Sequence, residues 1–229
     1  MRCNLCGGRA FTDMPKRPAV RCAACGSLER TRVAGLHVDQ LALPPRATIL
    51  HFAPELGLHR LLKAIGGDRY RALDIDPSLY PGRDAEPFDL CRDVFNLPAG
   101  EADLIVHNHV LEHLECNWTA VLVRLARALK PAGTMLFSMP VLPGDFTDAL
   151  TTAPRDEKLA RFGPMLHVRR FSPEHLQATL GMVFHIPERH DLTARFPPAV
   201  LEEANVPAHH WHGYTGTTVF RVTPAELRL

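Results

Sequence analysis

Apolar runs alternate with amphipathic segments through the middle of the chain. The apolar run Ala47 to Phe52 is followed by a helical pattern from Leu56 to Ile65 and by a second apolar run at Tyr70 to Ile75. Strands that alternate with helices are typical of a parallel sheet. The pattern predicts a further helix at 118–129 and further strands at 88–93, 102–106, 134–139, 182–188 and 217–222. The sequence therefore predicts a doubly wound α/β fold with a mostly parallel, seven-stranded sheet.

Four cysteines form two pairs near the N-terminus. Cys3 and Cys6 make one C-x-x-C pair, Cys22 and Cys25 make another, and fifteen residues separate the pairs. This is the spacing of a zinc ribbon, and four thiolates would close the coordination shell of the ion. The expected zinc is therefore structural. Two disulfides or free thiols are the alternatives.

A helical pattern from Ser27 to Leu43 follows the cysteines, and Pro44-Pro45 ends it. This segment is expected to join a small module to the main fold. The predicted domains are a zinc ribbon at 1–32 and an α/β domain at 33–229.

The composition argues against two classes of partner. Lys plus Arg number 26 and Asp plus Glu number 25 in 229 residues, so no global field attracts nucleic acid or an anionic membrane. No apolar run approaches the length of a membrane span, and the first residues lack the apolar core of a signal peptide. The expected protein is soluble, cytoplasmic and without a membrane partner.

The stretch ILHFAPEL at 49–56, followed by LDID at 73–76, has the succession of elements that is typical of a cofactor pocket. An apolar strand, a tight turn and a helix start are followed about twenty residues later by a strand that ends in acids. In doubly wound folds this arrangement places a nucleotide-type cofactor at the carboxyl end of the first strand, with an acid on its ribose.

Together with the segments HNHVLEHL at 107–114 and ALKPAGTMLFSMP at 128–140, these stretches resemble the class I S-adenosylmethionine-dependent methyltransferases, which have a Rossmann-like fold. The chain is similar to a bacterial subgroup with two C-x-x-C pairs, here continued by CGSLERTR at 25–32, LHFAPE at 50–55, NHVLEH at 108–113, RFG at 161–163 and HVRRF at 167–171. The resemblance implies a methyltransferase that uses S-adenosylmethionine.

The resemblance also implies roles for single residues. Ala53 to Gly57 would wrap the methionine end of the cofactor, and Asp74, with Asp76 as the near alternative, would accept the ribose hydroxyls. The adenine would meet Asp93 and pack on Val94, whereas Asn108 and His109 would face the sulfonium and the acceptor.

The first loop departs from the family's G-x-G-x-G pattern. The corresponding positions are Ala53, Glu55 and Gly57, and side chains at the first two restrict the close approach of backbone to a ligand. We hypothesise that the Glu55 carboxylate compensates by pairing with the cofactor's ammonium group.

Histidines are the candidates for a general base, because they titrate near neutrality. His109 is the preferred base, and His113 and His167 are further catalytic candidates; packing is the alternative role of His113. His109, Glu112 and His113 also form H-x-x-E-H, which read literally is a metallopeptidase motif. The ubiquinone-pathway O-methyltransferases are similar here, with a Glu-x-x-Glu-His that holds a divalent cation; this chain departs from that pattern because His109 replaces the first carboxylate, and a catalytic metal at these residues is an alternative.

Two irregular segments, 141–170 and 189–216, are expected to be insertions that cover the acceptor. Arg169, Arg170 and Trp211 would contact the substrate there. The alternatives are an arginine pair that caps the next helix, and a plain surface around Trp211.

Three functions are compatible with these features. The first is methylation of a small-molecule or glycan-precursor acceptor on oxygen or nitrogen. The second is methylation of RNA, including ribosomal RNA, with the ribbon as an RNA contact. The third is a non-catalytic adaptor that binds zinc and a nucleotide. The sequence leaves the oligomeric state open.

Overall fold

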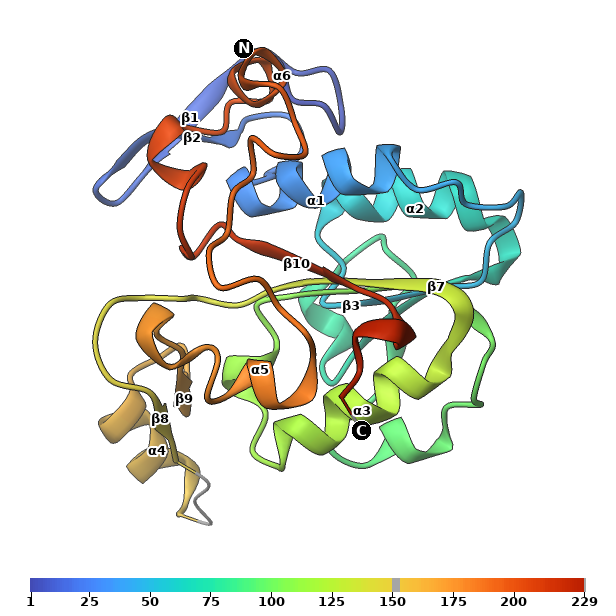
Figure 1. Ribbon diagram of the computed structural model, residues 1–229, viewed down its shortest axis with the longest axis vertical. Coiled ribbons are helices and arrows are strands. Elements are labelled where there is room, and N and C mark those ends of the chain that lie inside the picture. Colours follow the sequence, from blue (N-terminus) through green and yellow to red (C-terminus); the bar gives the residue numbers. More distant parts are fainter. Residues whose placement is uncertain (150–152, 229) are drawn as a thin grey trace.

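The computed structural model describes residues 1–149 and 153–228, and its centre is a six-stranded sheet in the order β10-β7-β6-β3-β4-β5 (Figure 1). The neighbours from β7 to β5 pair in parallel, and β10 pairs antiparallel with β7. The predicted doubly wound, mostly parallel fold is confirmed. The strands of this sheet are β3 (Ile49–Phe52), β4 (Tyr70–Asp74), β5 (Glu86–Pro87), β6 (Ala102–Asn108), β7 (Leu129–Ser138) and β10 (Val219–Val222).

Helices cover both faces of this sheet. Figure 1 shows α1 (Glu29–Asp39) and α2 (Leu56–Gly66) above it, and α3 (Trp118–Ala128) with α5 (Leu180–Val183) below it. Each face has its own buried apolar cluster. Strands buried on both sides read as continuous apolar runs, which is why the sequence marks β3 and β6 clearly.

The register places the ends of four strands at one edge. Phe52 of β3 lies opposite Leu73 of β4 and His107 of β6, and His107 lies opposite Phe137 of β7. The residues that follow these positions therefore share the carboxyl edge of the sheet, which is where doubly wound folds bind their ligands.

Two predicted strands differ from the structure. Residues 182–188 form no strand: α5 ends at Val183, and a single bridge joins Phe184 to Leu227. In the 88–93 segment, the Asp89 side chain accepts a hydrogen bond from the backbone N–H of Cys91, and the side chain of Asp93 accepts one from that of Asp89. Such local side-chain bonds compete with a strand ladder, so only the short β5 forms, just before this segment.

The ribbon is built on the hairpin of β1 (Phe11–Met14) and β2 (Arg17–Cys22). Arg32 joins it to the rest of the chain. Its fully buried guanidinium donates to the carbonyls of Val20 and Ser27 in the ribbon and to those of Ala204 and Asn205. Because α1 begins at Glu29, the expected boundary at residue 32 falls within one continuous helix.

The two irregular segments contain short elements. Residues 141–170 include β8 (Thr147–Asp148), α4 (Arg155–Phe162) and β9 (Arg169–Arg170), and residues 189–216 include α6 (Pro198–Glu203). Figure 1 shows the first group below the sheet and α6 beside the ribbon hairpin. Among the described helices, none has the length and apolar character needed to cross a membrane.

Candidate functional site

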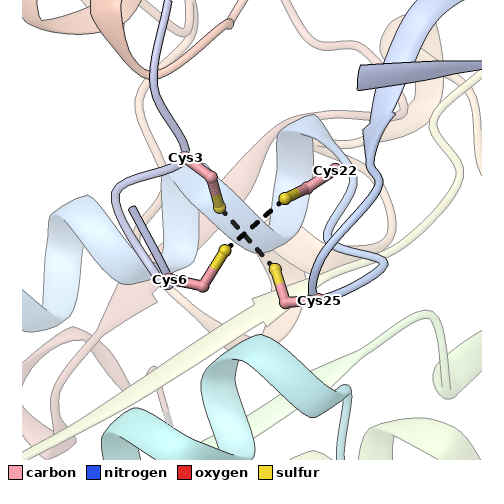
Figure 2. Close-up of side chains that lie close together, drawn as sticks. All are labelled: Cys3, Cys6, Cys22 and Cys25. Carbon is pink, nitrogen blue, oxygen red and sulfur yellow. Dashed lines mark hydrogen bonds between the residues drawn. The ribbon is translucent and has the colours of Figure 1, made fainter. Parts of the chain in front are cut away.

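The four predicted metal-binding cysteines converge at one point (Figure 2). The Sγ atoms of Cys3 and Cys25 are 3.7 Å apart, and those of Cys6 and Cys22 are 3.5 Å apart. Tetrahedral zinc with Zn–S bonds of about 2.3 Å requires sulfur separations of about 3.8 Å. The cluster therefore has the donor set and the dimensions of a structural zinc site.

The loop between β3 and α2 has the shape of a glycine loop without its first glycine. Ala53 adopts a left-handed conformation, with φ of +50°, and its N–H donates to the carbonyl of Leu73 in β4. A non-glycine residue in this conformation costs about 1 kcal/mol or more. The backbone turns at the edge of the sheet as a cofactor loop requires, even though the glycine is missing.

Gly57 packs closely against the ribbon. A Cβ atom at this position would lie 2.9 Å from Leu5 Cδ1 and 3.3 Å from Cys25 Sγ. The absence of a side chain lets the ribbon approach the first turn of α2. The predicted contact of Gly57 with the cofactor stays a prediction.

Glu55 is the centre of a hydrogen-bond network. Its Oε1 accepts from Arg30 Nη2 at 3.1 Å and from Thr31 Oγ1 at 2.9 Å, both in α1. Its Oε2 accepts from Asn108 Nδ2 at 3.0 Å, and Ser138 Oγ donates to Asn108 Oδ1 at 2.9 Å. The network joins α1, the first loop and the ends of β6 and β7. The sequence reasoning missed Thr31 and the pairing of Arg30 with Glu55.

The two acids that follow β4 differ in environment. Asp74 is half-buried, and burial raises the pKa of its carboxyl; hydrogen bonds from the backbone N–H of Asp76 and from the Tyr80 side chain oppose this effect. Asp76 is exposed, and its carboxylate caps the turn at Pro77–Leu79 by accepting from Ser78. Of the two, Asp74 lies closer to the end of the sheet and has the more enclosed carboxylate.

The segment after β5 carries the predicted adenine contacts. Asp93 is partly exposed, whereas Val94 is fully buried within the apolar cluster below the sheet. Cys91 in this segment forms a disulfide with Cys116 in the loop before α3. The sequence signal was the two cysteines left over when the ribbon takes four.

The predicted catalytic histidines lie on two neighbouring segments. His109 follows β6 with φ of +54°; its Nδ1 is 3.3 Å from Glu112 Oε1, and its Nε2 is 3.3 Å from the Gly216 carbonyl oxygen. The rings of His113 and His167 meet edge to face, with centroids 4.8 Å apart. The structure thus brings all three candidates to the region beyond the end of β6.

Burial sets the ionisation of this group. Desolvation lowers the pKa of His109 to about 3, with a smaller effect from the charge of Arg30. Desolvation also raises the pKa of Glu112 to about 8 and lowers the pKa values of His113 and His167. His109 is therefore uncharged at neutral pH and can accept a proton, although weakly.

The three predicted substrate contacts have other roles in the structure. The buried guanidinium of Arg169 donates to the carbonyls of Leu111, Leu114 and Cys116, and it forms an ion pair with Asp148 at 2.7 Å. These bonds hold the 111–116 loop in place, and the contact of Arg169 with a substrate stays a prediction.

Arg170 and Trp211 also bind backbone. The exposed Arg170 donates to the Pro143 carbonyl, and Trp211 donates from Nε1 to the Val206 carbonyl at 2.9 Å while it packs against the upper apolar cluster. Each of the two side chains is therefore hydrogen-bonded to a carbonyl of its own irregular segment, 141–170 or 189–216.

Comparison with known proteins gives one family and several similar folds. A family model described as a methyltransferase domain matches residues 29–181, more than half of the chain. A search of curated proteins finds no match.

One similar solved structure is the complex between the Haloferax volcanii Trm112 methyltransferase activator and a candidate methyltransferase. The identity is 16%, the alignment covers 82% of this chain and 87% of that chain, and the TM-score is 0.51. A candidate sarcosine dimethylglycine methyltransferase from Galdieria sulphuraria is similar at 14% identity, with 85% of each chain covered and a TM-score of 0.50. At these identities the likeness concerns the fold.

Proposed function

Because the chain belongs to the methyltransferase-domain family, we propose that this enzyme transfers the methyl group of S-adenosylmethionine to an oxygen or nitrogen of a small-molecule or glycan-precursor acceptor. The observation that carries the proposal is the convergence of Ala53, Glu55, Asp74 and Asn108 at the carboxyl edge of the sheet. S-adenosylmethionine presents an ammonium, a ribose and an adenine, and this edge offers carboxylates and apolar surface for them.

The cofactor lies across the ends of β3 and β4. Asp74 accepts hydrogen bonds from the ribose hydroxyls, and Asp93 meets the adenine amine. Ile75 is 71% exposed and Leu79 is 65% exposed, which is unusual for large apolar side chains and supplies a surface that an adenine ring can cover. Val94, which the resemblance predicts to pack on the adenine, is fully buried within the apolar cluster below the sheet.

The acceptor lies beyond the end of β6, near His109. Methyl transfer needs the nucleophile in line with the sulfonium at about 3 Å and, for a hydroxyl or amine, removal of a proton. His109 accepts that proton. Because burial lowers its pKa to about 3, it is a weak base, and it serves best an acceptor that becomes strongly acidic as the methyl group is transferred, such as a hydroxyl oxygen.

One structural zinc occupies the cluster of Cys3, Cys6, Cys22 and Cys25. Four thiolates leave no open coordination position, so this ion stabilises the ribbon and takes no part in methyl transfer. The near-equality of acidic and basic residues and the segments 141–170 and 189–216 favour a small acceptor over RNA.

A matched pair of variants tests the cofactor site. Asp74→Asn should weaken the binding of S-adenosylhomocysteine, measured by calorimetry, by about tenfold or more, because the ribose loses a charged acceptor. Asp76→Asn, which changes an exposed turn cap, should change affinity less than twofold. Equal effects of both variants, or no binding by the unmodified protein, would contradict the assignment.

RNA is the second candidate acceptor, because the ribbon exposes Arg2, Arg9, Lys16 and Arg21 on its surface. An RNA acceptor predicts binding that weakens steeply as salt is raised. Filter binding with ribosomal RNA at two salt concentrations tests this. Salt-sensitive binding that Arg9→Gln and Arg21→Gln reduce would favour RNA, and retention of no RNA at low salt would leave the small acceptor.

A further inference from the structure

We propose that Glu112, His113 and His167 form a second metal site, separate from the ribbon, for a divalent transition-metal ion. One donor atom from each of these three residues lies within 4.8 Å of the other two. Metal–ligand bonds of about 2.0–2.2 Å place donor atoms about 3–4 Å apart, so small side-chain rotations bring the three onto one ion. His109, which completes the H-x-x-E-H pattern in the sequence, is not one of the three.

The Glu112 carboxylate is the observation that points to a ligand. Its side chain is fully buried, and neither oxygen accepts a hydrogen bond from the described part of the chain. Two imidazole nitrogens lie close to Oε1, His109 Nδ1 at 3.3 Å and His113 Nε2 at 3.9 Å. A buried carboxylate without hydrogen bonds is costly, and a cation among the neighbouring imidazoles removes that cost.

Two backbone segments hold the donors in place. Glu112 and His113 lie in a turn at Leu111–His113, whose carbonyl at Leu111 accepts from the buried Arg169. His167 follows Leu166, a bulky residue with φ of +49°. Non-glycine residues in this conformation persist where the surrounding structure fixes them, and they are frequent at functional sites.

The ligand set indicates the class of ion. Two imidazoles with one carboxylate suit iron, manganese, cobalt or zinc, and three protein ligands leave coordination positions open. An ion bound by Glu112, His113 and His167 would connect the segment around residue 167 to the loop that follows β6.

Metal binding can be measured without an assay of methyl transfer, so the site can be tested whether or not the proposed function holds. Protein with its ribbon zinc retained should bind one further Co²⁺ or Mn²⁺ per chain in calorimetry. Cobalt in the ribbon would give strong sulfur-to-metal charge-transfer bands, whereas cobalt at Glu112, His113 and His167 should give weak ligand-field bands alone.

Two variants and a control decide the result. Glu112→Gln and His167→Gln should each weaken uptake of the second ion by at least about tenfold, while zinc content and far-UV circular dichroism stay unchanged. His209→Gln changes an exposed histidine outside the cluster and should bind the second ion as the unmodified protein does. Uptake of zinc alone by the unmodified protein, or equal uptake by all variants, would overturn the proposal.

Discussion

The Oε2 atom of Glu55 accepts a hydrogen bond from Nδ2 of Asn108 at 3.0 Å. This contact joins the loop after β3 to the last residue of β6, which are neighbours in space although far apart in sequence. The other carboxylate oxygen is held by Arg30 and Thr31, from the helix that directly follows the ribbon. The ribbon is therefore connected, through α1, to the loop that we assign to the cofactor.

Replacement of Glu55 by Gln tests what this carboxylate does. The variant removes a partly buried ion pair with Arg30, so we expect stability to fall by about 1–2 kcal/mol. If Glu55 also pairs with the cofactor's ammonium, affinity for S-adenosylhomocysteine should fall about tenfold, as measured by calorimetry.

Two controls separate pairing from loop support. 5′-Methylthioadenosine lacks the ammonium group, so its affinity should change little in Glu55→Gln. Arg30→Gln keeps the carboxylate and removes only its ion pair. Unchanged binding of S-adenosylhomocysteine by Glu55→Gln would exclude the pairing with the ammonium, and an equal loss for both ligands would indicate loop support alone.

Removal of zinc should weaken the cofactor site as well as the ribbon. Without the ion, the cysteine turns lose their anchor, Leu5 leaves Gly57, and the start of α1 no longer fixes Arg30 and Thr31 against Glu55. We expect chelation to lower the melting temperature and to reduce cofactor affinity by several-fold. Re-addition of zinc should restore both; cofactor binding that stays constant while zinc is lost would show that ribbon and loop are uncoupled.

Gly57→Ala measures the contact between ribbon and α2 directly. An added methyl group meets Leu5 Cδ1 at 2.9 Å, so overpacking should cost about 1–3 kcal/mol in chemical denaturation, although alanine favours a helix. The double variant with Leu5→Ala should recover part of the loss. Gly216→Ala is the matched control, because nothing lies within 4 Å of its added methyl group. Equal stability of Gly57→Ala and Gly216→Ala would contradict the packing.

Stability should fall in acid because three histidines are buried. Desolvation lowers the pKa values of His37, His51 and His107 to about 3 from 6.5. Between pH 6.5 and pH 3 the unfolded chain therefore binds more protons than the folded chain. The contribution of these histidines to the free energy of unfolding is fully present above pH 6.5 and is lost as the pH falls. Each group contributes about 1.4 kcal/mol per pH unit in that range.

His107 offers the cleanest test of this effect, since it stacks on Phe137 and its ring nitrogens have no hydrogen-bond partner in the described chain. His107→Leu should flatten the dependence of unfolding free energy on pH by about one proton between pH 6 and pH 4. Val106→Ala, a buried neighbour without a titratable group, should lower stability and keep the slope. The same slope in both variants would mean that His107 is protonated in the folded protein.

The strands and the cluster of four cysteines could be predicted from the sequence because each follows a local rule. β3, β6 and the second half of β7 contain apolar runs, and the four cysteines have a fixed spacing. Residues 182–188 show the limit of that rule: their apolar pattern predicted a strand, but the first two residues end the helix α5 and Phe184 makes a single bridge to Leu227. A short apolar run does not distinguish the two outcomes.

The sequence pattern did not predict which neighbours a given residue contacts. Arg169 looked like a substrate ligand because arginine binds anions, but its guanidinium is occupied by backbone carbonyls some fifty residues away in the chain. Gly57 looked like part of a cofactor loop, and its missing side chain makes room for Leu5. Both depend on packing between distant segments, which leaves no periodic trace in the sequence.

The disulfide between Cys91 and Cys116 connects two loops that flank the sheet edge from different strands. One carries Asp93, and the other follows Glu112 and His113. Closing this loop destabilises the unfolded chain by about 3 kcal/mol in the entropic model, and it places Asp93, Glu112 and His113 within one covalent ring. Because thiol reductants open such bonds, a reducing environment would release the segment of Asp93 from its covalent link to the loop before α3.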